Sequence, residues 1–323
     1  MIRRGLLILG SLLGLAVLAF LWMARHAFYG SHESIPVKIE KGANAKTIAQ
    51  VLHKNQVIAS PQAFLILAEI TGISRNFHYG PYRFEKNRYW GILQKLALGE
   101  TYKIKVVIPE GWTACQTGER LEGEGIIQNK EIFLQYAIRE KLEGKFFPET
   151  YFLEPSMEPE AAAEIMRGQY QKVFTTEMAQ KAKDLKMTED QILTLASIIE
   201  REARADEDRA LISSVYHNRL RKKMLLEADP TVQYALSSGR FWKDRLTYKD
   251  LKVISLYNTY RLPGLPPGPI CSPGLKSIQA ALEPANTSFL YFVADGTGRH
   301  QFFSNHKSHI EFQKANRKKL KTR

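Results

Sequence analysis

The chain has 323 residues, of which 44% are hydrophobic and 24% charged, and its net charge is +13. This composition is typical of a globular protein and excludes a disordered or low-complexity chain, and the length suffices for about two domains of roughly 150 residues each. The positive charge favours polyanionic partners, among them anionic lipids and acidic cell-wall polymers as well as nucleic acid. Part of it lies in the tail 314–323, a charge run typical of a solvated helix end.

The segment after the first four residues is predicted to be a membrane anchor. Residues 5–24 carry no charge, and about 20 apolar residues can span a bilayer core of about 30 Å as a helix. A cleavable signal peptide would have an apolar core of about 7–15 residues before a site of small residues, whereas residues 20–23 are bulky. Arg3 and Arg4 favour a cytoplasmic N-terminus at residues 1–4. We therefore expect a single-pass protein of the inner membrane, with the rest of the chain in the periplasm.

After a juxtamembrane link at residues 25–34, the apolar pattern predicts a small mixed module at 35–101. Its expected elements, set by apolar periodicity and by cap and turn residues, are a strand ending before residue 42, helices at 46–53 and 60–71, a strand at 82–84 and a helix at 89–98. The alternation of residues 103–106 predicts another strand.

The remainder, residues 102–323, is predicted to be mainly helical, which makes the fold class α+β. The expected helices lie at 113–121, 130–140, 158–183, 189–205 and 208–222, with one more starting at 229, and capping-box patterns mark the starts at 113 and 188. The proline- and glycine-rich residues 263–274 predict a rigid surface loop. Strands at 290–293 and 301–303 predict a short hairpin, and a basic helix follows.

The sequence disfavours a metal site and leaves the state of the two cysteines open. Cys115 and Cys271 are far apart and lack metal-ligand spacing, so one disulfide and two free thiols are both consistent with the sequence. His300, His306 and His309 lack the His-Glu-x-x-His arrangement of a zinc-binding helix. We expect no metal ion and no cofactor.

The predicted helix at 189–205 carries two glutamates with different surroundings. Residues three and four apart share a helix face, so Glu202 lies over the apolar Ile198 and Ile199. Glu200 points elsewhere and has Arg204 four residues on as its expected ion-pair partner. A carboxyl at the end of an apolar stripe is desolvated, which raises its pKa and keeps it protonated as a general acid. Glu202 fits that role and Glu200 a structural one, although charged last turns are also common in helices without catalytic function.

Motifs along most of the exported part resemble the endolytic murein transglycosylase family, also called the YceG-like family. In chain order they are GPYRF at 80–84, IPEG at 108–111, LEGKFFPETY at 142–151, LASIIEREA at 195–203, VYHNRL at 215–220, ADPTVQYAL at 228–236, YNTY at 257–260, GLPPGPICSPG at 264–274 and YFVADGTGRHQF at 291–302. Each motif alone is weak, but the ordered set is specific. The family's catalytic glutamate is the second of a Glu-x-Glu pair, which is Glu202 here; the next residue, Ala203, departs from the Thr or Ser frequent in relatives.

The resemblance implies a LysM-like module at 35–101 and a catalytic domain at 102–323. It implies a lyase that cuts the MurNAc–GlcNAc bond of nascent peptidoglycan strands, leaves 1,6-anhydro ends and so ends elongation. One glutamate, Glu202, would serve as both acid and base, whereas a second carboxylate in the cleft would favour a hydrolase. Glu149 and Asp229 are the candidates for that second group.

Further residues are candidates for binding the substrate. Glu149 could line the groove or satisfy local backbone donors, and Asn218 suits a sugar amide or hydroxyl. Tyr257 and Asn258 could supply a stacking surface and a hydrogen bond, although a loop aromatic more often packs. Asp229 has the residue type and position of a helix cap.

The expected partners are glycan strands, the inner membrane and, from the resemblance, peptidoglycan synthases. Nucleic acid is disfavoured because an exported chain does not meet it and no recognition motif is present. A non-catalytic cell-wall scaffold is the alternative function, and it would be excluded if changing Glu202 abolished cleavage while binding remained.

Overall fold

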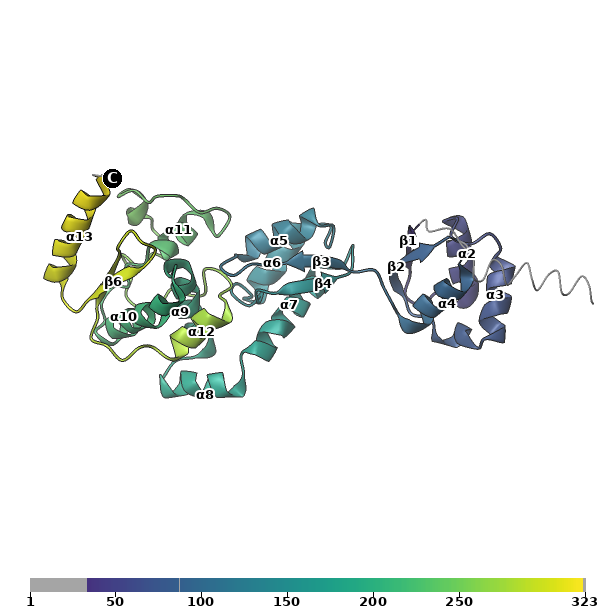
Figure 1. Ribbon diagram of the computed structural model, residues 1–323, viewed down its shortest axis with the longest axis horizontal. Coiled ribbons are helices and arrows are strands. Elements are labelled where there is room, and N and C mark those ends of the chain that lie inside the picture. Colours follow the sequence, from purple (N-terminus) through teal and green to yellow (C-terminus); the bar gives the residue numbers. More distant parts are fainter. Residues whose placement is uncertain (1–33, 87, 322–323) are drawn as a thin grey trace, which may run out of the picture. The chain divides into compact units, whose positions relative to one another are not determined.

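The computed structural model describes residues 34–86 and 88–321, which belong to two compact units divided between Ile104 and Lys105 (Figure 1). The anchor predicted at residues 5–24 lies outside the described residues. Within the described ranges, no helix combines the length and the apolar character needed to cross a membrane.

The first unit contains the strand–helix–helix–strand order that the sequence predicts. Its elements are β1 (Ser34–Ile39), α2 (Ala45–Lys54), α3 (Pro61–Ile70), a short 3-10 helix η1 (Ile73–Asn76), β2 (Gly80–Glu85) and α4 (Tyr89–Leu98). The two strands pair antiparallel, with Val37 opposite Tyr82. The predicted start at Ser60 is confirmed, since its hydroxyl accepts a hydrogen bond from the amide of Ala63 (3.2 Å). The helices close over a core that includes the fully buried Phe64.

The second unit is mostly helical with two small sheets. Its elements are β3 (Ile104–Val107), α5 (Ala114–Gly123), α6 (Lys130–Arg139), β4 (Thr150–Leu153), α7 (Pro159–Val173), α8 (Thr176–Asp184), α9 (Glu189–Glu202), η2 (Asp206–Asp208), α10 (Arg209–Arg221), α11 (Asp229–Ser237), η3 (Asp250–Lys252), α12 (Leu275–Leu282), β5 (Tyr291–Ala294), β6 (His300–Phe303) and α13 (His306–Lys321). Strand β3 pairs with β4, and β5 with β6 as the predicted hairpin. The chain is therefore α+β, as the sequence predicts, with most residues of this unit in helices.

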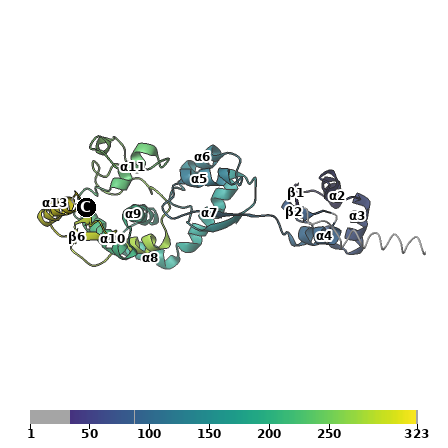
Figure 2. The ribbon, with the colours of Figure 1, turned by 45° about the horizontal axis from the view of Figure 1, so that its top comes forward.

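Helix α9 is the central helix of the second unit. It lies between α11 on one side and α10 and α12 on the other (Figures 1 and 2). Its residues from Ile192 to Ile199 are all buried, because apolar or small side chains occupy nearly every position there. The predicted capping box of Thr188 and Gln191 is confirmed, so the start of α9 is fixed by two reciprocal hydrogen bonds. Helix α9 therefore holds the residues at its C-terminal end in a fixed position.

Two predicted helices differ from the structure, and two elements were not predicted. The helix expected at 189–205 ends at Glu202. The single helix expected at 158–183 is two helices, because the Thr175 hydroxyl accepts a hydrogen bond from the amide of Met178 (3.3 Å) and so starts a new helix. The predictions also omit β4 and α12; the latter begins directly after the Pro-Gly loop, with Gly274 at its N-cap. The question left open for the cysteines is answered, since Cys115 and Cys271 are both buried and free.

Candidate active site

Glu202 is the last residue of α9, at the end of its buried apolar face. Ile198 and Ile199 beneath it are completely buried, as the helical spacing predicts, while Glu202 itself is half-buried. The helix stops directly after it, with the amide of Ala203 donating to the carbonyl of Ile199 (2.9 Å). The carboxyl group therefore extends from the end of a fixed helix.

A tyrosine holds one oxygen of this carboxyl group. The hydroxyl of Tyr216, a buried residue of α10, donates to Glu202 Oε1 (3.2 Å). The other oxygen, Oε2, has no hydrogen-bond partner among the described residues. Tyr216 thus orients the carboxyl group and leaves one oxygen free to carry and transfer a proton.

Burial raises the pKa of Glu202 to about 7, and the negative charge of Asp229 acts in the same direction. The hydrogen bond from Tyr216 and the positive charge of Arg219 oppose this rise in part. The C-terminal end of a helix is also its negative end, which further disfavours the charged carboxylate. Near neutral pH both protonation states of Glu202 are therefore populated.

Asp229 is the second carboxylate that the structure brings to this site. The predicted role as a helix cap is wrong, since α11 begins at Asp229 itself, and the N-cap is Ala228, which makes no side-chain cap bond. The Asp229 carboxylate instead accepts a hydrogen bond from the hydroxyl of Tyr260 (2.6 Å). Glu149 lies elsewhere: it is exposed and accepts from the side chain of Gln169 on α7 (2.7 Å).

Glu200 has the structural surroundings that the sequence predicts, but with a different partner. Its side chain is only 8% exposed and lies 3.4 Å from Arg209, and it accepts a hydrogen bond from the amide of Gly274 (3.0 Å). The expected partner Arg204 follows the end of α9 at Glu202, so the helical spacing of four residues no longer brings the two side chains together.

The two candidate asparagines are fully engaged with the backbone. The side-chain nitrogen of Asn218 donates to the carbonyls of Thr287 and Phe289 (2.9 and 2.8 Å). Asn258 is completely buried and donates to two carbonyls of the turn 251–253 (3.0 and 2.8 Å). Both amides therefore fix loops, and neither has a free donor for a sugar.

The three histidines also have local partners. The His300 ring lies 2.8 Å from the Asp208 carboxylate, and the rings of His306 and His309 pack on Tyr291, with centroids 5.4 Å away in both cases. Among the described residues, no group of three His, Cys, Asp or Glu side chains could hold a metal ion.

Residues 37–315 match the YceG-like family. The chain belongs to this family. It is 35% identical to an endolytic murein transglycosylase of Bacillus subtilis over 86% of this chain and 84% of the relative. It is 27% identical to one of Streptococcus pneumoniae, over 85% of this chain and 57% of that longer protein. The crystal structure of a yceG-like protein from Listeria monocytogenes covers 87% of this chain and 99% of its own, at 31% identity and a TM-score of 0.57.

The second unit of this YceG-like protein also contains a pocket of about 660 Å³, which we call the Glu143 pocket. Its lining includes Ala114, Ile138, Glu143, Tyr234, Tyr257 and Pro269. Of these residues the sequence singles out Tyr257 alone. Glu143 was missed, although its place in a motif between the buried Leu142 and Phe146 is a signal that could have found it.

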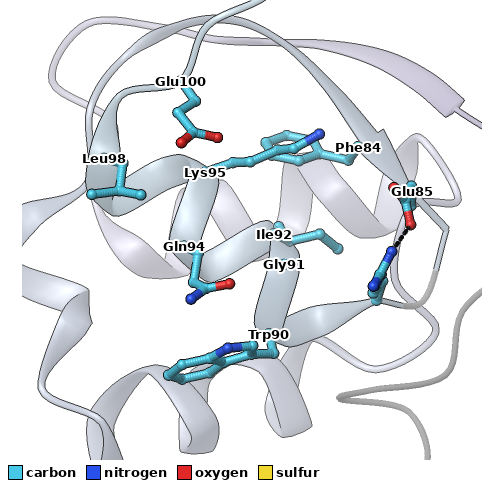
Figure 3. Close-up of a pocket in the computed structure, with 10 residues that line it drawn as sticks. Phe84, Glu85, Trp90, Gly91, Ile92, Gln94, Lys95, Leu98 and Glu100 are labelled. Carbon is cyan, nitrogen blue, oxygen red and sulfur yellow. Dashed lines mark hydrogen bonds and ion pairs between the residues drawn. The ribbon is translucent and has the colours of Figure 1, made fainter.

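A smaller hollow of about 300 Å³ lies in the first unit, between β2 and α4. Figure 3 shows the indole of Trp90 at one edge and the side chains of Gln94 and Lys95 along α4. Glu85 and Arg88, which form an ion pair (2.5 Å), also line this hollow. The sequence predicts only a strand at 82–84 and a helix at 89–98 in this region, and it singles out none of these residues as a functional candidate.

Proposed function

We propose that this protein is a membrane-anchored endolytic murein transglycosylase, a lyase that cuts the MurNAc–GlcNAc bond of nascent peptidoglycan strands. Membership of the YceG-like family and the names of the relatives support this activity. The observation that carries the assignment of Glu202 is its carboxyl group, held on one oxygen by Tyr216 and free on the other. A pKa near 7 suits a residue that must give and then take a proton.

One carboxyl group is sufficient for this reaction. Protonated Glu202 gives its proton to the glycosidic oxygen as the bond between that oxygen and the anomeric carbon of MurNAc breaks. The resulting carboxylate then takes the proton from the 6-hydroxyl of the same sugar, whose oxygen bonds to the anomeric carbon. The product is a 1,6-anhydro end, no water is added, and Glu202 is protonated again.

Asp229 suits a supporting role in this reaction. Positive charge develops on the sugar ring when the glycosidic bond breaks, and a carboxylate fixed beside the acid stabilises it electrostatically. The hydrogen bond from Tyr260 holds the Asp229 carboxylate in place (2.6 Å). The same negative charge keeps the pKa of Glu202 high, so Asp229 acts on both the acid and the charged sugar.

The nearness of Asp229 to Glu202 also supports a second candidate, a hydrolase. Glycosidases that add water use a pair of carboxylates, one as acid and the other as base or nucleophile. In that case Asp229 would activate water or attack the sugar, and the new ends would carry a reducing sugar. The two reactions differ by one water in the mass of the product.

The anchor at residues 5–24 would hold the enzyme in the inner membrane with its catalytic unit in the periplasm. Nascent strands are made at that surface, so cutting there would end their elongation and bring the enzyme near peptidoglycan synthases. Nucleic acid plays no part in this proposal.

The test is digestion of purified glycan strands by the full chain, with the products read by mass spectrometry. We expect ends lighter by one water, and a loss of roughly 10²–10⁴-fold in rate for Glu202→Gln, the range of general acid–base catalysis. Glu200→Gln is the matched control and should still cleave, because its carboxyl group serves an ion pair. Water-bearing ends that disappear in Asp229→Asn would make the enzyme a hydrolase. Strand binding without cleavage by the wild type would indicate a scaffold.

A further inference from the structure

The Glu143 pocket has the size and walls of a ligand site, and no step of the proposed reaction uses it. Its volume of about 660 Å³ lies within the roughly 300–1,000 Å³ of small-molecule pockets. Helices α5 and α6 form one wall. The other wall is formed by α11 with the loop residues 255–257 and 267–269.

Glu143 places a carboxyl group in this pocket at an energetic cost. Its Oε1 accepts from the amide of Ala114 (3.0 Å) and its Oε2 from the hydroxyl of Tyr234 (3.1 Å). Burial nevertheless raises the pKa of Glu143 to about 7. The start of α5 already has a complete capping box in Thr113 and Gln116, so the helix does not need a buried carboxyl group to begin. The amide of Gly144 is a third donor to this carboxyl group, so one of its roughly four lone-pair positions remains for a donor from a ligand.

Two tyrosines give the pocket both an apolar surface and unused polar atoms. The rings of Tyr234 and Tyr257 lie with centroids 4.8 Å apart and planes inclined by 44°. Tyr234 gives its proton to Glu143, so its oxygen remains an acceptor. The Tyr257 hydroxyl makes no hydrogen bond within the described part of the chain. Ring faces beside unpaired hydrogen-bonding groups match a sugar, which has apolar C–H faces and hydroxyls at its edges.

The charges around the pocket favour an uncharged ligand. Besides Glu143, the lining includes the acids Glu131 and Asp190 and the bases Lys141 and Arg240. Asp190 is already paired with Lys145 (2.9 Å). The lining has no strong excess of one sign, as a site for a polyanion or a polycation would have.

Two segments, helix α11 and the turn 257–260, contribute residues both to this pocket and to the surroundings of Glu202. Helix α11 carries Asp229 at its start and Tyr234 further along, and the turn 257–260 carries Tyr257 and Tyr260. Tyr260 and Asp229 are bonded to each other, and Asp229 lies beside Glu202. The pocket and the surroundings of Glu202 therefore share helix α11 and the turn 257–260.

We propose that the Glu143 pocket is a second sugar subsite, which binds an uncharged N-acetylated amino sugar of the strand being cut at Glu202. This inference rests on the proposed function for the identity of the strand. Glu143 and Tyr234 accept hydrogen bonds from the amide or hydroxyls of the sugar, Tyr257 donates one, and the two rings cover its apolar face. Only a strand long enough to reach from Glu202 to the pocket gains affinity from it, so binding depends on strand length.

The test compares long strands with the shortest oligosaccharide that the wild type cleaves. Tyr257→Phe removes one hydroxyl and keeps the ring. It should raise KM for long strands roughly five- to tenfold, the effect of one hydrogen bond, with kcat and the cleavage of the short substrate unchanged. Tyr248→Phe, at a tyrosine that is 87% exposed, is the control and should change neither. Glu143→Gln should act as Tyr257→Phe does. If Glu143→Gln fails to fold, Tyr257→Phe decides.

Strand binding to the Glu202→Gln chain, with and without Tyr257→Phe, separates this inference from the proposed function. Cleavage that depends on Glu202 but is unaffected by Tyr257→Phe on long strands would overturn the subsite and leave the function intact. An equal effect on both substrate lengths would also overturn it. Weaker binding of long strands in Tyr257→Phe, in a protein whose wild type cleaves nothing, would uphold the subsite and refute the function.

Discussion

Glu200 and Glu202 are two positions apart on one helix and have opposite surroundings. Glu200 faces Arg209 and the start of α12, where its charge is paired, whereas Glu202 extends over apolar residues toward Tyr216. This division follows from helix geometry, because residues two apart point about 200° away from one another. The sequence therefore predicts that Glu202 lies over apolar residues without an ion-pair partner and that Glu200 is paired, although it misidentifies the partner of Glu200.

The rate of cleavage should fall with pH above neutrality. Glu202 must be protonated to act as the acid, and its pKa of about 7 means that the active form decreases about tenfold per pH unit well above that value. Initial rates on soluble strands between about pH 6 and pH 9.5 measure this. In Asp229→Asn the inflection should move to lower pH, because the charge that raises the pKa is gone. A profile that stays flat to high pH would contradict the role of Glu202.

The raised pKa of Glu202 also predicts that this residue lowers the free energy of unfolding at high pH. Its folded pKa of about 7 lies above the ordinary glutamate value of 4.5, so the stability from the protonated form is complete below that lower value and is lost as pH rises through 7. Glu202→Gln stays neutral, and at pH 8 its free energy of unfolding should exceed the wild-type value by roughly 1–3 kcal/mol. Urea titrations at pH 4 and pH 8 measure the difference, which should vanish at pH 4. Glu207→Gln, whose side chain is 68% exposed, should show none.

Residue type alone does not show which of the substrate-binding candidates has a group available for a sugar. Asn218 and Asn258 have the side chain that a sugar site needs, but their donors are taken by backbone carbonyls, which lie in the distant segment 287–289 for Asn218 and in the preceding turn for Asn258. Tyr257 is the candidate that lines a pocket. Burial and partners distinguish these cases, and residue type alone shows neither.

At the scale of elements, the predictions succeed where the signal is local. Capping boxes, the proline after Ser60 and the apolar spacing of α9 all depend on residues within one helix. They fail where a neighbour decides the outcome. Strand β4 is paired with β3 and has only four residues, too few for a clear alternating pattern, although Thr, Tyr and Phe favour strands.

Arg209 should be essential for joining the elements around α9. It is paired with Glu200 of α9 (3.4 Å) and with Asp206 of η2 (3.1 Å), and it also hydrogen-bonds Ser277 of α12. Arg209→Met leaves the buried charge of Glu200 unpaired and should lower the free energy of unfolding by about 3–5 kcal/mol. Urea denaturation measures it, and the double variant with Glu200→Gln should recover most of the loss.

A matched control comes from the exposed pair of Arg299 and Glu207 (3.5 Å). Because solvent screens that pair, Arg299→Met should cost under about 1 kcal/mol. Equal losses for the two arginine variants, or no recovery in the double variant, would show that the buried pair does not hold these elements together.

At the scale of the whole chain, the groups proposed to act on one strand come from separate segments. Glu143 precedes β4, Glu202 ends α9, Asp229 begins α11, and Tyr257 lies in the loop before the proline-rich stretch. Sequence patterns identify several of these residues one by one. They come together through the packing of α11 on α9 and of the segment after α11 on the start of α5, where the Thr113 hydroxyl donates to the carbonyl of Gly239.

The two units should unfold in separate transitions, because each has a core of its own. The core of the first unit is drawn from residues 37–96 and that of the second from residues 170–282. Phe64→Ala removes a fully buried ring of the first core and should destabilise only that unit, by about 3–5 kcal/mol. Ile198→Ala should destabilise only the second, by about 2–5 kcal/mol. Scanning calorimetry resolves the transitions, and cleavage of short soluble oligosaccharides should follow the second alone. A single transition that both variants shift equally would mean that the chain unfolds as one cooperative unit.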